Sequence, residues 1–158
     1  MDRASDVLRA SGALQGAGIA ERQRMAVLEV LAAGLAAADP WHAVRRHLEV
    51  DRGRVRGGEE VFSPRRVWVL GAGKASGVMA EAAEEILGGL VAGGLVIVKD
   101  GHRTSTRRVE LAEAAHPVPD ARGVDATARL VEVGRTATAD DLVLWVLAHL
   151  VASLGWLT

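Results

Sequence analysis

The chain has 158 residues, 49% hydrophobic and 25% charged, which is the composition of one ordinary globular domain and excludes overall disorder. Nineteen basic and 20 acidic residues give a net charge of −1, which argues against nucleic acid as the main partner. Cysteine is absent, so disulfides, thiolate metal sites and cysteine nucleophiles are excluded. With no secretory signal and no run of about 20 uncharged apolar residues, we expect a cytoplasmic protein without a membrane partner.

The first part of the chain predicts two helices and then an irregular segment, after an N-terminal lead of residues 1–20. Residues 21–38 repeat apolar side chains at helical spacing, and Asp39-Pro40 ends that helix because the residue before proline avoids helical geometry. Asp39 then suits the cap of a short second helix over residues 41–48. Residues 49–64 are rich in glycine, arginine and glutamate and predict a loop or a weak hairpin, whose interleaved acidic residues favour a solvated surface over a nucleic-acid patch.

From residue 66 onward, short apolar runs alternate with helical patterns. Strands are predicted over residues 66–70, 94–99, 108–112 and 141–146, and helices over 73–87 and 120–133. This alternation is typical of an α/β protein with a Rossmann-like, mostly parallel sheet flanked by helices. Such sheets bind ligands where the strands end, so we expect residues 71–76, 99–104 and 116–120 to share one edge.

The turn Gly71-Ala72-Gly73-Lys74-Ala75-Ser76 follows the first of these strands and is predicted to hold an anion. Its glycines allow a close approach of the backbone, the helix N-terminus offers N–H groups, and Lys74 adds a positive charge. A Walker-type phosphate loop is excluded because Trp68 stands where its first glycine would be. A dinucleotide site fits imperfectly, since Gly77 comes one position late and Asp100 lies late for a ribose-binding acid. The structural alternative is a tight turn with a surface lysine.

Two further polar segments follow later strands. Lys99-Asp100-Gly101-His102 leaves the second predicted strand with groups that can hold an anion or move a proton. His116-Pro117-Val118-Pro119-Asp120 precedes the last helix, where the prolines restrict the backbone beside His116 and Asp120 can cap the helix. A polar loop and a structural corner are equally good interpretations of these segments from local sequence. Both lysines of the chain, Lys74 and Lys99, stand at the ends of predicted strands.

Several of these motifs occur along the chain in one specific order. In chain order they are Asp39-Pro40, Val69-Leu70-Gly71-Ala72-Gly73-Lys74-Ala75, Gly94-Leu95-Val96-Ile97-Val98-Lys99, Gly101-His102, Ala115-His116-Pro117-Val118-Pro119-Asp120 and Asp140-Asp141-Leu142-Val143-Leu144. Each motif alone is weak, but the ordered set resembles the N-terminal domain of the glycerate 2-kinase family, some members of which are named hydroxypyruvate reductases. The resemblance covers most of the chain, from about residue 22 to residue 144.

The resemblance implies a kinase that transfers phosphate from ATP to D-glycerate, with Mg²⁺, and gives 2-phosphoglycerate in a cleft between this domain and a second α/β domain. It implies that Lys74 is catalytic and meets the glycerate or the transferring phosphoryl group, because positive charge and positioning dominate such catalysis. The implied substrate-binding residues are Gly71, Gly73, Lys74, Ser76, His102 and His116. No metal ligands in this chain are predicted, the residues that bind the nucleotide are not identified, and homo-oligomers are compatible with this interpretation.

The resemblance ends after about Leu144. Family members continue with a loop of the type Ser-Gly-Gly-x-Ser-Ala-Leu, whereas residues 145–158 here form an apolar tail without it. We therefore expect a domain over residues 21–144, an aberrant tail that suggests a frameshift or a truncated reading frame, and a kinase fragment that is inactive alone. The alternatives are a small Rossmann-like module that binds a nucleotide or sugar phosphate, an NAD-dependent hydroxypyruvate reductase, and a remnant without function.

Overall fold

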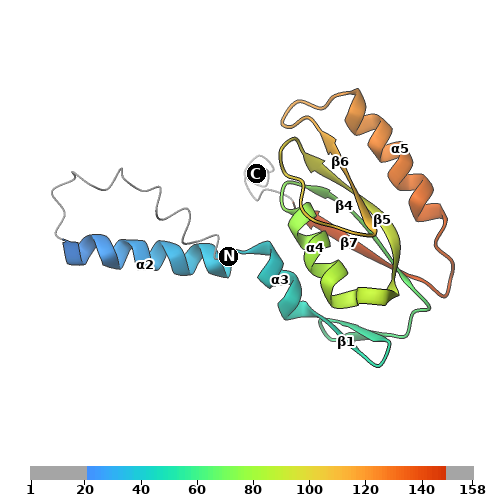
Figure 1. The fold of residues 1–158 in the computed structure, drawn as a ribbon, viewed down its shortest axis with the longest axis horizontal. Helices are drawn as coiled ribbons and strands as arrows, with labels where there is room; N and C mark the ends of the chain where they lie inside the picture. Colours follow the sequence, from blue (N-terminus) through green and yellow to red (C-terminus); the bar gives the residue numbers. More distant parts are fainter. Residues whose placement is uncertain (1–20, 149–158) are drawn as a thin grey trace, which may run out of the picture.

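The computed structural model describes residues 21–148, which form a parallel sheet with helices on both faces, a small antiparallel sheet beside it and a projecting helix (Figure 1). The predicted lead, residues 1–20, and the last ten residues of the predicted tail, 149–158, lie outside the described residues. The helices are α2 (Glu21–Ala37), α3 (Pro40–His47), α4 (Ser76–Leu87), the 3₁₀ turn η2 (Gly88–Leu90) and α5 (Ala121–Arg135). The strands are β1 (Leu48–Asp51), β2 (Arg54–Gly57), β3 (Glu60–Phe62), β4 (Val67–Gly73), β5 (Val91–Lys99), β6 (Val109–Ala114) and β7 (Leu142–Ala148).

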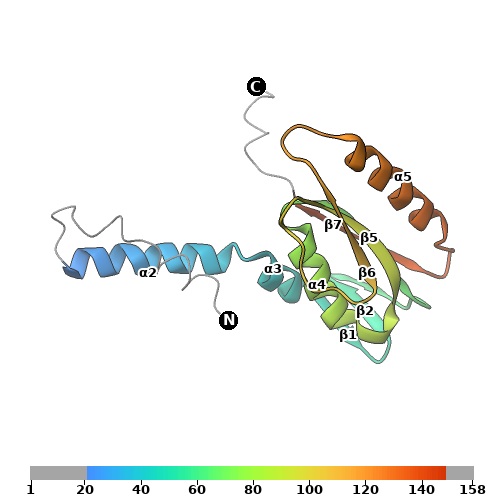
Figure 2. The same cartoon turned by 45° about the horizontal axis from the view of Figure 1, so that its top comes forward.

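The two predicted N-terminal helices are confirmed. The Asp39 carboxylate caps α3 by accepting hydrogen bonds from the backbone N–H groups of Trp41 at 2.8 Å and His42 at 3.2 Å. Helix α2 projects away from the sheets, and its apolar side chains stay largely exposed, with Val30 73% accessible (Figure 2). No single helix among residues 21–148 is long and apolar enough to cross a membrane, although the bent pair α2 and α3 passes that test by length and composition.

The segment predicted as a loop or weak hairpin forms the three-stranded antiparallel sheet β1-β2-β3. Its alternation is hard to recognise in the sequence because only two of its apolar side chains reach the main core. Leu48 is 7% exposed and Val55 1% exposed, whereas Val50, Val61 and Phe62 remain exposed. The strands are therefore held by pairing and by two anchor residues, and not by a continuous apolar face.

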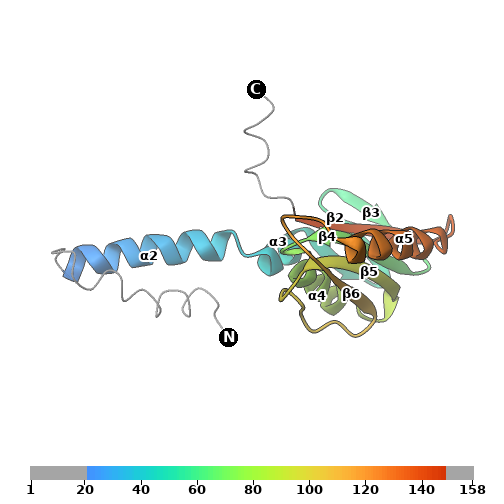
Figure 3. The same ribbon diagram turned by 90° about the horizontal axis from the view of Figure 1, so that it is seen from above.

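The predicted Rossmann-like parallel sheet is confirmed, with strand order β6-β5-β4-β7. Alternate residues of β4 serve two cores, because Val67 and Val69 pack on the α4 side and Leu70 packs with Leu95 and Leu130 on the α5 side. Helices α4 and α5 accordingly lie on opposite faces of the sheet (Figure 3). This double burial explains why the strand sequences are nearly continuous apolar runs.

The sequence pattern predicted that helix α4 begins at Gly73, but it begins at Ser76. Strand β4 continues to Gly73 because β7 pairs with it along its full length, up to the pair of Gly73 with Ala148. Residues 145–148, the start of the predicted tail, are the last part of β7. The strand pairing therefore brings Ala148 to the same edge of the sheet as the turn after β4.

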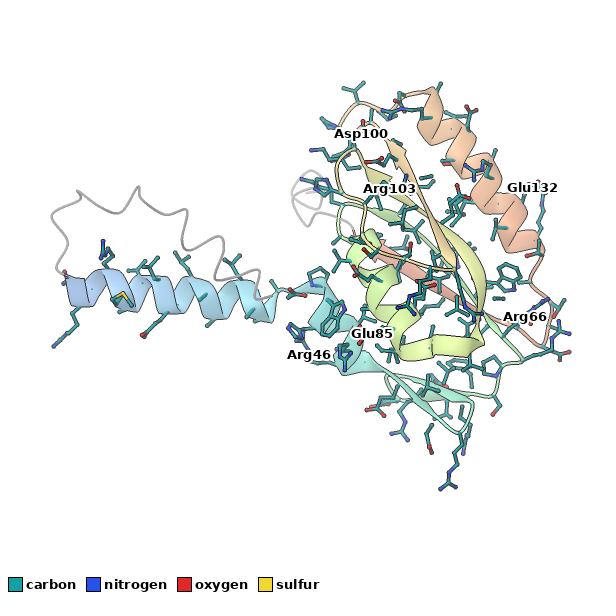
Figure 4. The ribbon with its side chains drawn as sticks, in the orientation of Figure 1. Arg46, Arg66, Glu85, Asp100, Arg103 and Glu132 are labelled. Carbon is teal, nitrogen blue, oxygen red and sulfur yellow. The ribbon has the colours of Figure 1, made fainter. Side chains whose placement is uncertain are left out.

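The amino-terminal edge of the parallel sheet is held by Asp141. Its side chain has 0% exposure, and it accepts hydrogen bonds from Arg66 Nε at 3.0 Å, the Thr138 backbone N–H at 2.9 Å and Trp68 Nε1 at 3.4 Å. Burial opposes the charge of this carboxylate, but the hydrogen bonds outweigh burial and hold its pKa well below the ordinary value. Arg66 marks this edge and Asp100 the opposite one in Figure 4.

We predict that Asp141 makes the protein sensitive to acid. Because its pKa is depressed in the folded state, its contribution to stability is complete above the ordinary value of 3.8 and is lost as the pH falls through the folded pKa. The urea midpoint of the wild type should therefore drop more steeply below pH 4 than that of Asp141→Asn. The control is Asp140→Asn, which changes the neighbouring aspartate and should keep the slope of the wild type. Equal slopes for all three proteins would contradict this role.

A second buried carboxylate ties helix α4 to the turn before β6. Glu84 is 9% exposed, and it accepts hydrogen bonds from the backbone N–H groups of Arg107, at 2.6 Å, and of Arg108. These two N–H groups precede β6 and have the Glu84 side chain as their acceptor. The connection between β5 and β6 contains no helix, and Glu84 fastens it to α4.

Glu84→Ala should lower the free energy of unfolding by about 2 kcal/mol, because it leaves two partly buried backbone donors without their carboxylate acceptor. Chemical denaturation at neutral pH measures this loss. The matched control is Glu85→Ala, which removes an exposed carboxylate paired with Arg45 and should change stability by less than about 1 kcal/mol. A similar small effect for both variants would show that the Glu84 bonds contribute little.

Candidate functional site

The carboxyl ends of β4, β5, β6 and β7 surround a pocket of about 450 Å³. The chain leaves β4 toward β5 on one side, whereas β7 returns to pair with β4 on the other, so the pocket lies where the strand order reverses. Open α/β sheets bind their ligands at this position. The lining residues are Ala72, Gly73, Lys74, Ala75, Ile97, Val98, Lys99, Ala114, Ala115, His116 and Ala148.

The two lysines that the sequence placed at strand ends line this one pocket. Lys74 is exposed in the turn after β4, and Lys99 is half-buried as the last residue of β5. Within the described part of the chain, neither ammonium group forms an ion pair. The adjacent helix α4 begins at Ser76, and its N-cap residue, Ala75, has only a methyl side chain, which cannot accept a capping hydrogen bond. Two ammonium groups beside a helix N-terminus make this pocket suited to an anion.

The two candidate histidines differ in position. His116 follows β6, has an exposed side chain and lines the pocket; its peptide bond to Pro117 is cis. His102 does not line the pocket. Its ring Nδ1 lies 3.2 Å from the Asp100 backbone oxygen, and its own backbone oxygen lies beside Gly77 of α4. Of the two, His116 is therefore the one whose imidazole can reach a molecule in the pocket.

Gly71 and Ser76 lie within the packed framework below the pocket. A Cβ atom on Gly71 would lie 2.1 Å from the Val146 backbone oxygen, so glycine permits the close pairing of β4 with β7. Ser76 is fully buried; its Oγ donates to the Ala72 backbone oxygen at 2.7 Å and accepts from the Ala148 N–H at 3.2 Å. Gly73 lines the pocket itself and has φ of +128°, a conformation that favours glycine.

An arginine that the sequence analysis did not select joins two of the loops around the pocket. Arg122 donates to both carboxylate oxygens of Asp100 at 2.8 Å and, through Nε, to Asp120 at 2.7 Å. These hydrogen bonds hold the pKa of Asp100 and that of Asp120 below the ordinary carboxyl value. Nothing in the spacing distinguished Arg122 from the many other arginines, because its partner Asp100 lies 22 residues away in the chain.

The residues around the pocket do not fit a magnesium ion. Mg²⁺ prefers oxygen ligands, chiefly carboxylates, and the pocket lining contains none. Among residues 21–148, no group of three or more histidine, aspartate or glutamate side chains is arranged to hold a metal. The described residues thus offer positive charge to an anion but no set of oxygen ligands for a magnesium ion.

Comparison with known proteins identifies the family of this domain. Residues 26–149 match the family model described as Domain of unknown function (DUF4147), and the chain belongs to this family. A glycerate 2-kinase from Pyrococcus horikoshii is 30% identical over 117 residues, which cover 73% of this chain and 26% of the relative. A putative hydroxypyruvate reductase from Agrobacterium vitis is 34% identical over 121 residues, 77% of this chain and 25% of the relative.

Solved structures agree with these relatives. A glycerate kinase from Thermotoga maritima matches with a TM-score of 0.63 and 29% identity, and a protein from Pyrococcus horikoshii OT3 matches with a TM-score of 0.70 and 29% identity. Each match covers 80% of this chain and less than a third of the other chain. The predicted resemblance to the N-terminal domain of the glycerate 2-kinase family is therefore confirmed, and the chain spans about a quarter of the length of the curated relatives it matches.

We predict that Gly71 serves strand pairing. Gly71→Ala should destabilise the protein by about 2–3 kcal/mol, since the added methyl group overlaps the backbone of Val146. Gly57→Ala in β2 is the control, because a Cβ atom there meets nothing within 4 Å. Thermal or urea denaturation compares the two variants, and equal stability would contradict the packing role.

Proposed function

We propose that this domain forms one wall of the active site of a D-glycerate 2-kinase, in which Lys74 binds the anionic groups of the substrate. The observation that carries the proposal is the convergence of Lys74, Lys99 and His116 on one pocket at the strand-order reversal. Membership of a family with relatives named glycerate 2-kinase supports the same assignment. D-Glycerate is a small carboxylate, which suits a pocket of about 450 Å³ with two ammonium groups at its edge.

The proposed reaction needs little covalent chemistry from this domain. The 2-hydroxyl oxygen of glycerate forms a bond to the γ-phosphorus of ATP, the bond from that phosphorus to the bridging oxygen of ADP breaks, and the hydroxyl proton leaves. Lys74 holds the glycerate carboxylate or the transferring phosphoryl group, and Lys99 adds positive charge from the next strand. His116 is the group at the pocket that can take the hydroxyl proton.

The other residues that the resemblance implied for substrate binding act indirectly in this proposal. Gly71 and Ser76 keep β4, α4 and β7 together below the turn, and Gly73 allows the backbone to bend beside Lys74. His102 does not line the pocket, and its contacts with the Asp100 backbone and with Gly77 of α4 support the loop that follows Lys99. The described residues do not fit Mg²⁺, so we assign the binding of the ion and of ATP to no residue of this chain.

The hydroxypyruvate reductase named among the relatives suggests a second candidate, an NAD-dependent enzyme. One observation counts against it. Asp100, the residue closest to the expected ribose-binding position, has both carboxylate oxygens bound to Arg122. A ribose hydroxyl would have to share this carboxylate with the bidentate Arg122, so the geometry favours the kinase.

The test is a titration of ¹⁵N-labelled protein with D-glycerate, 2-phosphoglycerate, inorganic phosphate and NADH. We expect the two glycerates to shift the amide resonances of residues 72–75 and 114–116. Lys74→Ala should weaken D-glycerate binding about tenfold, which corresponds to about 1.4 kcal/mol. Arg135→Ala, which also removes one surface positive charge, should leave the affinity unchanged.

Other results would reassign the pocket. Binding of inorganic phosphate without D-glycerate would favour the nucleotide or sugar-phosphate module, and binding of NADH would favour the reductase. A coupled assay with ATP, Mg²⁺ and D-glycerate measures turnover of the 158-residue chain, for which we expect none, because it corresponds to a quarter of its relatives. Turnover that disappears in Lys74→Ala would contradict the inactivity and support the role of Lys74.

A further inference from the structure

Two of the polypeptide segments that border the pocket leave the sheet from neighbouring strands and meet at Arg122. One segment begins at Asp100, directly after Lys99 of β5, and the other runs from Ala115 to Asp120, after β6. Arg122 Nη1 and Nη2 each donate to one oxygen of Asp100 at 2.8 Å, and Nε donates to Asp120 Oδ2 at 2.7 Å. One guanidinium group therefore bridges both segments.

Asp120 extends this bridge across the whole second segment. Its Oδ1 accepts from the Gly123 N–H at 3.2 Å, which caps α5, and from the Ala115 N–H at 3.5 Å, at the start of the segment. The carboxylate thus holds both ends of the loop that carries His116. Movement of Asp120 would alter the path of the backbone on either side of His116.

The first segment is fixed on the other side of the bridge. The Asp100 N–H donates to the Ala114 backbone oxygen at 3.2 Å, and the Gly101 N–H donates to Glu113 Oε1 at 2.8 Å. The Asp100 carboxylate then holds Arg122. Lys99, which lines the pocket, is the residue immediately before this anchored turn.

The geometry of this cluster differs from that of an ordinary surface ion pair. Isolated exposed pairs contribute little, because solvent screens them and the side chains lose entropy. Arg122 forms a bidentate pair and a third hydrogen bond, so its planar fork is fixed by two carboxylates on different loops. A lysine at this position could not reproduce three donors in that plane.

We propose that Arg122 is a positioning residue that holds Lys99 and His116 in a fixed relation across the pocket. It does not line the pocket, so it acts through Asp100 and Asp120 and not by contact with substrate. The effect on substrate affinity rests on the proposed function of the pocket, whereas the bridge between the loops is a property of the free protein.

The experiment compares Arg122→Gln and Arg122→Lys with Arg129→Gln. Arg129 is the matched control because it also lies on α5 and also pairs with a carboxylate, Glu110 of β6, but does not contact the loops around the pocket. In the free proteins, Arg122→Gln should speed hydrogen exchange at the Gly101 and Ala115 amides at least tenfold. Arg129→Gln should leave both rates unchanged, and the urea midpoints of the two Gln variants should be similar.

Titration with D-glycerate supplies the second measurement. We expect Arg122→Gln to weaken binding about fivefold and Arg122→Lys to recover part of the loss, with Arg129→Gln equal to the wild type. Unchanged exchange rates in Arg122→Gln overturn the bridge, whatever the binding result. Faster exchange with unchanged affinity overturns the positioning role. A wild type that binds no D-glycerate refutes the proposed function and the effect on affinity, while the exchange rates still decide the bridge.

Discussion

The pairing of β4 with a parallel strand on each side is the constraint on which the site depends. Because β7 aligns with β4 along its full length and β5 aligns with it in register from Trp68 onward, the turn after β4 meets the ends of its two neighbours at one edge. Glycine at positions 71 and 94 permits this, since a Cβ atom at either would lie about 2 Å from a backbone oxygen of the adjacent strand. This close pairing therefore brings the turn that carries Lys74 to the pocket.

Charge is distributed unequally between the two edges of the sheet. At the amino-terminal edge the buried Asp141 carboxylate is surrounded by donors from Arg66, Trp68 and Thr138, so its charge is compensated within the protein. At the carboxyl edge Lys74 and Lys99 have no ion-pair partner among the described residues. One edge thus holds the framework together, and the other presents two lysines that form no ion pair among the described residues.

The fold class was predictable because both of its signals are local. Apolar runs such as residues 94–99 mark strands buried on both faces, and Asp39 and Asp120 mark helix starts through hydrogen bonds to residues two or three positions away. The small sheet β1-β2-β3 was not predicted in full, since its side chains are mostly exposed and their pattern carries little information. The start of α4 was predicted three residues early, because the extension of β4 depends on a partner strand 75 residues away.

The sequence by itself determined the alternation of strands and helices, the family, and the residue types at the strand ends, including the two lysines and His116. Each of these follows from neighbours in the chain or from an ordered set of short motifs. Tertiary structure alone decided that Lys74, Lys99 and His116 share a pocket, that His102 does not line it, and that Arg122 joins two loops. Strand order and hydrogen bonds between residues more than 20 positions apart set these relations, and no local pattern encodes them.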